Sequence, residues 1–322
     1  MYRRLTKYVL SMLAILLIAG CSYDTEITSA VQERVPVTFE LKTAPFNITR
    51  STTYENNLWS AGMNVSVKCT ADGESANLND TKTYVTASNG SGGFKLEGIN
   101  VANTFYWLDR SAAKSFELWY PSGDDIRKSQ SVLDDQTSAD LASYDLLFAS
   151  TTVSNAAAST VASLAFFHQM SCVIVNITEV PVGEEVTGVS FGSSNVAVKG
   201  TLSTAAMSNY STSSSSGGAT WSVVSTDKIN TIELKELASN KYCCILPPQS
   251  FGDGSTTLLT ITTKETATPT TTHSYSCTGA MSLYAGNLHT IDVNIAIGLS
   301  FKTTVEDWPT SGDNFHTGTA TY

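Results

Sequence analysis

Apolar and polar residues alternate with a period of two over most of this chain, from Val35 onward. Residues that alternate in this way place successive side chains on opposite faces of an extended strand. The alternating runs are short, and they are separated by Gly, Asn, Asp and Ser, the residues that form tight turns between strands. The pattern predicts an all-β protein made of many short strands.

The predicted strands form two sets of similar density, separated by a small, polar segment at residues 150–159. The first set occupies residues 37–41, 64–69, 83–87, 94–97, 105–108, 115–120 and 145–149, and the second occupies residues 161–178, 186–192, 196–202, 220–224, 242–246, 258–263, 274–278, 290–297 and 300–305. A short crossover helix is predicted at residues 131–143, and an exposed loop rich in Ser and Thr at residues 203–218.

The length of 322 residues is enough for two cores of ordinary size. Short, regularly spaced strands of this kind favour β-sandwiches. We therefore expect an N-terminal β-sandwich at residues 35–158 and a C-terminal β-sandwich at residues 159–322, arranged in tandem.

Residues 1–20 are predicted to form a secretory signal peptide. Arg3, Arg4 and Lys7 give it a positively charged start, and residues 9–20 form an uncharged apolar run of the length that such a signal needs. The run is too short to be a comfortable membrane span. No second apolar stretch of spanning length follows it, so we expect the remainder of the chain to be soluble.

The signal ends in LIAGC at residues 17–21, which resembles the lipobox of bacterial lipoproteins. The resemblance implies cleavage between Gly20 and Cys21 and attachment of fatty acyl chains such as palmitate to Cys21, with residues 21–34 as a tether to the outer membrane. Several acyl chains anchor a protein firmly, whereas a single chain binds only marginally. The alternative is an ordinary signal peptide that happens to contain a cysteine.

The charge of the chain argues against nucleic acid as a partner. The sequence has 29 Asp and Glu residues against 19 Lys and Arg, a formal net charge of −10. Proteins that bind nucleic acid need a basic surface to neutralise phosphates. Low charge content and abundant Ser, Thr and Gly are instead typical of an extracellular β-protein.

Five cysteines remain once Cys21 carries lipid, and they are Cys69, Cys172, Cys243, Cys244 and Cys277. An odd number argues against a complete disulfide framework. Two interpretations stay open: all five are buried structural thiols, or one pair of them is oxidised.

Residues 188–192 read GVSFG and match the G-x-S-x-G pattern that exposes a nucleophilic serine in some hydrolases. That pattern works only where a strand turns sharply into a helix, and residues 193–196 show no helical pattern. The serine of this segment, Ser190, is therefore predicted to be an ordinary strand residue.

No other group of residues predicts catalysis or metal binding. The remaining candidates are His168, His273, His289 and His316 and the acidic pairs Asp124-Asp125 and Asp134-Asp135. The histidines lack metal-ligand spacing, and the acidic pairs fall in polar loops, where solvated charge is the simpler interpretation. The sequence predicts a protein that is not an enzyme and has no cofactor.

Nine short segments follow one another along the chain: VTF at 37–39, TR at 49–50, LWSAGMNV at 58–65, DDQT at 134–137, YDLLFA at 144–149, LAFFHQMS at 164–171, LPPQ at 246–249, LYAGN at 283–287 and VEDW at 305–308. In this order they resemble the fimbrillin family of Mfa-like pilins and pilus-associated lipoproteins. The resemblance covers nearly the whole chain after the signal. It implies two tandem transthyretin-like β-sandwiches of Greek-key topology and a role as a subunit of a cell-surface fimbria.

The resemblance also implies assembly by strand exchange, in which a protease cuts after an arginine and the first strand leaves. In this chain the cut would fall between Arg50 and Ser51. The departing strand would present Val37, Phe39 and Leu41 to the core, and another subunit would supply the replacement. Removal of one strand exposes unpaired backbone groups and an apolar groove that another strand can fill.

Some details of this assembly stay open. Arg34 is a second candidate for the cut, which would then remove only the tether. The most evident C-terminal donor strand lies at residues 299–305, and the subunit type, whether stalk, tip or anchor, is undecided.

The leading hypothesis is a structural or adhesive fimbrial subunit at the cell surface, whose partners are other fimbrial subunits, the outer membrane and a host or bacterial surface ligand. The alternative is a surface lipoprotein whose sandwiches bind glycans. The candidate sugar-stacking residues are Trp59, Trp107, Trp119, Trp221 and Trp308. The first three lie in apolar strand contexts, which favours core packing.

Overall fold

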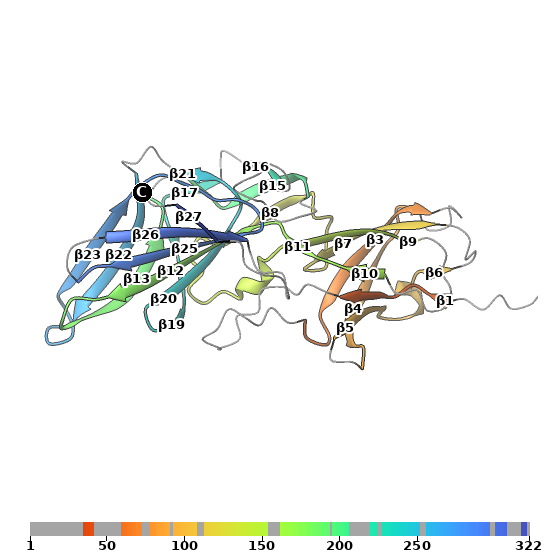
Figure 1. Cartoon of the computed structure of the whole chain (residues 1–322), viewed down its shortest axis with the longest axis horizontal. Coiled ribbons are helices and arrows are strands. Elements are labelled where there is room, and N and C mark those ends of the chain that lie inside the picture. The colour runs from red at the N-terminus through yellow and green to blue at the C-terminus, as the bar shows by residue number, and fades with distance from the viewer. Residues whose placement is uncertain are drawn as a thin grey trace, which may run out of the picture.

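The structure is a computed structural model of the chain, and it describes residues 35–41, 59–72, 78–90, 93–107, 113–153, 162–193, 195–205, 219–223, 227–251, 256–296, 300–307 and 317–320. The molecule is elongated, with two lobes along its long axis (Figure 1). Nearly all of the regular structure is strand, so the prediction of an all-β fold is confirmed.

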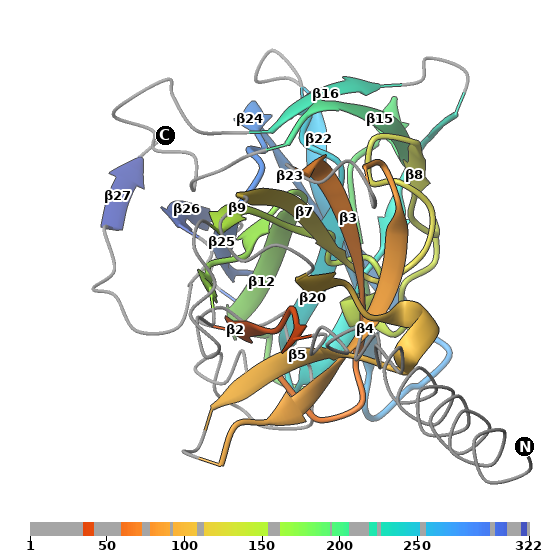
Figure 2. The same cartoon turned by 90° about the vertical axis from the view of Figure 1, so that its right-hand side faces the viewer.

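The first lobe is built on one eight-stranded sheet. In spatial order its strands are β10 (Ala162–Leu164), β2 (Phe39–Leu41), β5 (Phe94–Gly98), β4 (Thr81–Ser88), β3 (Asn64–Asp72), β7 (Lys114–Tyr120), β9 (Leu147–Val153) and β11 (Phe167–His168). Only β10 and β2 run parallel to each other. The pair β1 (Val35–Pro36) and β6 (Tyr106–Trp107) and the short turn of 3-10 helix η1 (Val101–Asn103) complete the lobe. Figure 2 shows this lobe end-on.

The second lobe contains two larger sheets. One has six strands in the order β19 (Lys235–Ala238), β20 (Lys241–Leu246), β12 (Ser171–Glu179), β25 (Asn287–Asn294), β26 (Ser300–Asp307) and β27 (Thr317–Ala320). The other has four, in the order β18 (Ile232–Glu233), β13 (Glu184–Phe191), β22 (Thr257–Glu265) and β23 (Thr272–Thr278).

Three small sheets accompany them. They are the pair β14 (Val196–Ala197) and β17 (Lys228–Ile229), the triplet β16 (Thr220–Val223), β15 (Lys199–Thr204) and β8 (Ser129–Ser131), and the pair β21 (Ser250–Phe251) and β24 (Met281–Ser282).

Each lobe has its own hydrophobic core, and strands β7 and β9 contribute to both. Within β7, Leu118 packs in the first core and its neighbour Trp119 in the second. Within β9, Ala149 packs in the first core and its neighbour Phe148 in the second. Successive side chains of a strand point to opposite faces, so these two strands tie the cores together.

The chain passes between the lobes more than once. Strand β8 precedes β9 in the sequence, yet it pairs with β15 of the second lobe. The segment at residues 150–159, where a domain boundary is predicted, lies partly outside the described residues, and the division into 35–158 and 159–322 stays a prediction. The strands on either side of it, β9 and β10, both belong to the eight-stranded sheet.

The strand predicted at residues 161–178 is divided into β10, β11 and β12. Residues 168–175 are all buried, because this segment passes from the sheet of one lobe into the sheet of the other and meets packed neighbours on both sides. Because side chains on both faces are buried, the sequence pattern carried no signal at the two points where this segment divides into separate strands.

The crossover helix predicted at residues 131–143 is much shorter than expected. Only Leu141–Ser143 is helical, as the 3-10 turn η2. Upstream, the Asp135 carboxylate accepts hydrogen bonds from the backbone N–H and hydroxyl of Thr137, and Asp140 accepts one from the N–H of Ala142. Such local bonds compete with the helical ladder, which limits the helix to one turn.

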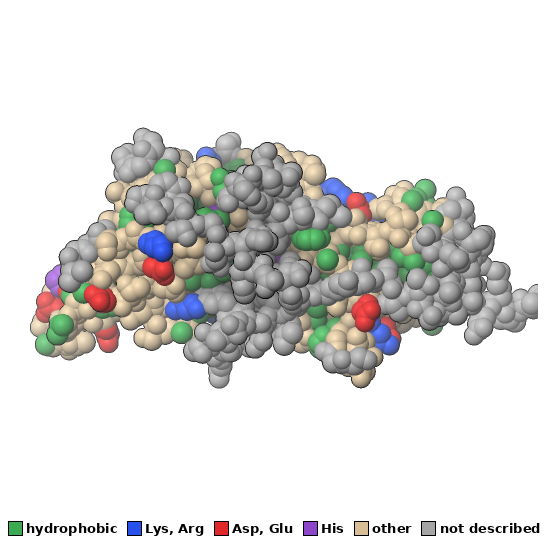
Figure 3. Space-filling view, in the orientation of Figure 1, with side chains coloured by type: hydrophobic (Ala, Val, Ile, Leu, Met, Phe, Trp, Pro, Cys, Tyr) green, Lys and Arg blue, Asp and Glu red, His purple; other side chains and the backbone are tan. Residues whose placement is uncertain are grey.

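On the face seen in Figure 3, charged side chains occur in small, separate groups of both signs. Among the described residues, no helix has the length and apolar character that crossing a membrane requires.

Candidate functional site

The first strand predicted from the sequence, residues 37–41, is shorter in the structure, where only β2 (Phe39–Leu41) is a strand. The segment lies inside the first lobe, with alternate side chains directed into the core. Val37 is 2%, Phe39 0% and Leu41 8% exposed, whereas Glu40 between them is exposed. These are the three residues that the sequence assigns to the inward face of an exchangeable strand. Their burial follows from the alternation of apolar and polar residues along the strand.

Strand β2 is bonded on both of its edges, over three residues each. Phe39 pairs with Leu96 of β5 on the antiparallel side and with Ala162 of β10 on the parallel side. Parallel pairing with β10 could not be foreseen from the sequence, because β10 lies more than a hundred residues away along the chain. Loss of β2 would leave two rows of backbone groups unpaired.

Just before β2, the backbone of Val37 is held by two groups of the lobe. Its N–H donates to the Phe105 carbonyl at 2.8 Å, and its carbonyl accepts from the Tyr84 hydroxyl at 3.1 Å. The same hydroxyl accepts from the Phe105 N–H at 3.0 Å. Burial raises the pKa of Tyr84, so this hydroxyl stays protonated and can donate.

An aromatic cluster surrounds the central side chain of the strand. The centroid of the Phe39 ring lies 5.3 Å from that of Phe116, edge to face, and 5.8 Å from that of Tyr84. Phe105 completes the cluster, 5.5 Å from Phe116. We call the site that β2 occupies, formed by the rings of Tyr84, Phe105 and Phe116 and by the edges of β5 and β10, the first-strand slot.

Near one end of the same sheet, Asp72 and Lys114 form a fully buried ion pair. The Lys114 Nζ and Asp72 Oδ1 atoms are 2.5 Å apart, and both side chains are 0% exposed. The two residues face each other across β3 and β7. Buried charges are tolerated only when paired, so this pair fixes the register of the two strands beside the slot.

The segments that carry the family resemblance hold the sheets together. The Gln136 amide donates to the Ile245 carbonyl at 3.0 Å and accepts from its N–H at 3.0 Å, as a neighbouring strand would. Gln249 bonds both backbone groups of Ala197 in the same way, at 2.9 and 2.7 Å. These glutamines therefore serve as structural links.

The histidine of the LAFFHQMS segment has a structural place as well. His168 Nδ1 lies 2.6 Å from Asp145 Oδ1, and both side chains are fully buried. Asp145 belongs to the YDLLFA segment, so the pair joins two of the segments noted in the sequence. Sequence reasoning expected a packed strand residue at His168 and missed its carboxylate partner, which no spacing rule indicates.

The serine of the G-x-S-x-G segment lies inside a strand. Ser190 is in β13, opposite Thr260 on one side and Glu233 on the other, and the chain continues without a helix. The sharp turn that exposes a nucleophile is missing from this described segment.

The acidic pairs are engaged in surface contacts. Asp124 pairs with Lys128 at 2.8 Å, and Asp125 with Lys68 at 3.5 Å. Asp135 accepts hydrogen bonds from nearby Thr137. Within the described part of the chain, no three His, Cys, Asp or Glu residues are arranged to hold a metal ion.

The five cysteines in the described part of the chain are free thiols, and all are buried. Burial raises the pKa of Cys69 and of Cys277 to about 11, and it raises the pKa values of Cys172 and Cys244 well above the ordinary thiol value. A thiol with a raised pKa is a poor nucleophile. The Cys172 and Cys243 sulfurs lie 3.4 Å apart, which makes them the closest candidates for the oxidised pair that the sequence left open.

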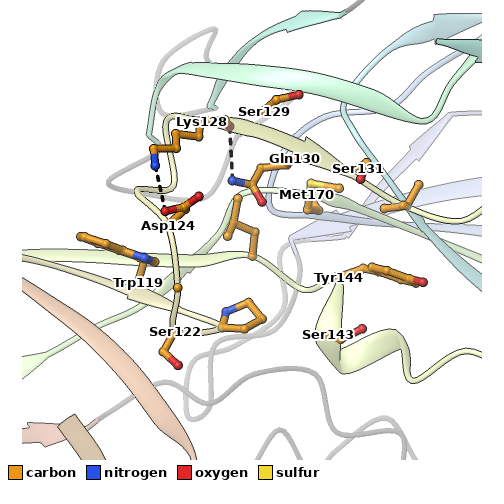
Figure 4. A pocket seen from close by; sticks show the side chains of 14 residues that line it. Trp119, Ser122, Asp124, Lys128, Ser129, Gln130, Ser131, Ser143, Tyr144 and Met170 are labelled. Carbon is orange, nitrogen blue, oxygen red and sulfur yellow. Dashed lines mark hydrogen bonds and ion pairs between the residues drawn. The ribbon is translucent and has the colours of Figure 1, made fainter. Parts of the chain in front are cut away.

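A pocket of about 280 Å³ lies where the lobes meet, remote in sequence from β2. Trp119, Lys128, Tyr144 and Met170 are among the residues that line it (Figure 4). Sequence reasoning placed Trp119 in the core and did not identify this pocket, because its walls come from three separate stretches of chain.

Several residues of the predicted processing sites lie outside the described residues. They are Gly20, Cys21, Arg34, Arg50 and Ser51. Lipidation at Cys21 and cleavage between Arg50 and Ser51 stay predictions.

The C-terminal donor strand expected at residues 299–305 corresponds largely to β26. This strand pairs with β25 over its whole length and with β27 on its other side. It is therefore an interior strand of its own sheet.

The fold is shared with solved structures. It resembles a candidate cell adhesion protein from Bacteroides ovatus, with a TM-score of 0.57 and 15% sequence identity, over 88% of this chain and 100% of that one. It also resembles a candidate cell adhesion protein from Bacteroides uniformis, with a TM-score of 0.56 and 16% identity, over 85% of this chain and 99% of that one. No curated protein matches the chain in sequence.

The sequence also matches a family model, that of the fimbrillin-like proteins, over residues 49–308. The match includes most of both lobes and nearly all of the segments on which the resemblance depended. This chain therefore belongs to the fimbrillin-like family.

Proposed function

We propose that this chain is a subunit of a cell-surface fimbria, made as an outer-membrane lipoprotein with lipid on Cys21. A protease cuts between Arg50 and Ser51, the first strand leaves, and a strand from another subunit takes its place. The role is structural or adhesive and involves no catalysis.

The observation that carries this proposal is the first-strand slot. Phe39 is fully buried among aromatic rings, yet its strand has only three paired residues on each side. A short strand with large apolar side chains can be exchanged for another strand of similar pattern. The binding free energy of the incoming strand comes from the side-chain pockets and from backbone hydrogen bonds to the two exposed strand edges. Membership of the fimbrillin-like family gives the exchange a biological setting.

Cleavage and polymer formation test the proposal together. The mature protein is treated with an arginine-specific protease, and the products are analysed by mass spectrometry and by electrophoresis before and after boiling. We expect loss of the residues up to Arg50 and a ladder of multimers that dissociates on boiling. The Arg50→Ala variant should give neither, whereas Arg34→Ala should behave like the unaltered chain. Polymers from cells that retain an N-terminus at Cys21 would contradict the proposal.

The membrane anchor is tested separately. Replacement of Cys21 by Ser should release the protein from the membrane fraction, because a lipid-free tether has no apolar group to insert. Retention of the Cys21→Ser protein in that fraction would rule out lipidation as the anchor.

A further inference from the structure

The pocket between the lobes is built from parts of the chain that the assembly mechanism does not use. Its walls come from the end of β7, the loop at residues 121–128, β8, the region of η2, and Met170 just before β12. The volume is about 280 Å³. Liquid water occupies about 30 Å³ per molecule, so the space suits one ring-sized molecule and is too small for an extended peptide.

One polar group at this pocket has no hydrogen-bond partner among the residues that the structure describes. Trp119 is 1% exposed, and no described residue accepts a hydrogen bond from its buried indole Nε1–H. Figure 4 shows the indole at the edge of the pocket with its nitrogen on the inner side. A buried donor without an acceptor is unfavourable, and an acceptor oxygen on a bound molecule would satisfy it.

The rest of the lining combines hydroxyl groups with apolar surface. Four serines line the pocket, at residues 122, 129, 131 and 143. A serine hydroxyl can both donate and accept hydrogen bonds, although that of Ser143 already donates to the Asp140 carbonyl at 2.6 Å and can only accept from a ligand. Val132, Leu146 and Met170 supply apolar surface, with Tyr144 beside them. The matching ligand has several hydroxyl groups and an apolar ring face.

The charges at the pocket cancel each other. Lys128 Nζ and Asp124 Oδ1 are 2.8 Å apart, and no other charged residue lines the pocket in the described part of the chain. A phosphate or a sulfated sugar would require unpaired cations. The ligand is therefore neutral.

We propose that this pocket binds one neutral hexose residue of a surface glycan, with a sugar oxygen accepting the Trp119 indole N–H. The inference does not depend on strand exchange, because the Trp119 side chain packs in the second core whereas β2 packs in the first. A fimbrial subunit with such a pocket would carry its adhesive site at the junction of its lobes.

The test measures binding of methyl glycosides of glucose, galactose, mannose and N-acetylglucosamine to the mature protein by saturation-transfer NMR. We expect saturable binding in the millimolar range for at least one of them. Trp119→Phe removes the N–H and keeps an aromatic ring, so it should weaken binding by up to about tenfold, the effect of one lost hydrogen bond. Ser131→Ala should weaken binding as well.

Trp107→Phe is the matched control, because Trp107 is also buried, at 3% exposed, but lies in the first core. Its binding should match that of the unaltered protein, and the thermal midpoint of each variant should establish that it is folded. No saturable binding of any of the four glycosides, or equal weakening by Trp107→Phe and Trp119→Phe, would overturn the proposal.

Discussion

Phe39 packs its ring edge to face against Phe116 and also touches Tyr84, with no part of its side chain exposed. Truncation of a buried Phe removes its transfer free energy and leaves a cavity. We expect Phe39→Ala to lower the free energy of unfolding by about 3–5 kcal/mol, as measured by urea denaturation. Glu40→Ala, on the exposed face of the same strand, should change it by less than about 0.5 kcal/mol. Similar effects of the two substitutions would contradict the central place of Phe39.

The buried pair of Asp72 and Lys114 allows a test at the same scale. Lys114→Met leaves the Asp72 carboxylate buried without its cation, and removal of one partner of such a pair costs about 3–5 kcal/mol. The double variant Asp72→Leu with Lys114→Met removes both charges and should recover most of that loss. Chemical denaturation of the single and double variants distinguishes the outcomes. A double variant as unstable as the single one would show that the pair itself supplies stability.

His289 predicts how stability depends on pH. Burial lowers its pKa to about 3, so the folded state keeps the ring neutral while the unfolded state protonates below its ordinary pKa of about 6.5. The unfolded state thus binds more protons, and stability falls as the pH drops from about 6.5 toward 3.

From pH 7 to pH 5 this group alone should remove about 2 kcal/mol from the free energy of unfolding. In the unaltered protein, His289 Nε2 accepts a hydrogen bond from the Tyr284 N–H, and His289→Gln keeps an acceptor there. The free energy of unfolding of this variant should fall correspondingly less over the same pH interval. Urea titrations at the two pH values give the comparison. Identical pH dependence of the two proteins would show that His289 does not titrate differently on unfolding.

At the scale of elements, the sequence located most strands well, because each short run of alternating residues has one face in a core. Strands β3, β5 and β7 lie within a few residues of their predicted positions. Alternation carries no information about which strand becomes the neighbour of which. The parallel partner of β2 and the division of residues 161–178 could not be derived from it.

The first strand as an element gives a further prediction. A protein cut after Arg50 and separated from its first strand should bind a synthetic peptide of residues 35–50, because the peptide restores both rows of backbone bonds and the Phe39 contacts. The same peptide with Phe39 replaced by Ala should bind about a hundredfold more weakly, the equivalent of roughly 3 kcal/mol. Isothermal titration calorimetry measures both. Equal affinities would show that the Phe39 side chain does not contribute to binding in the first-strand slot.

For the whole molecule, the family segments mattered through their order along the chain. His168, Gln136 and Gln249 look like unrelated polar residues in the sequence, and each becomes interpretable only when its partner from another segment is placed beside it. The pocket at the lobe junction escaped prediction for the same reason. Features that need one stretch of chain were predictable, and features that need two or three were not.

The grip of β5 and β10 on both edges of β2 has a mechanical consequence. An edge strand can be peeled away one hydrogen bond at a time, whereas a strand clasped on two sides must lose both rows of bonds and its aromatic contacts almost at once. If a neighbouring subunit's strand occupies the same slot, tension along a fimbria would meet stiff resistance up to an abrupt breaking force, with little gradual yielding before it.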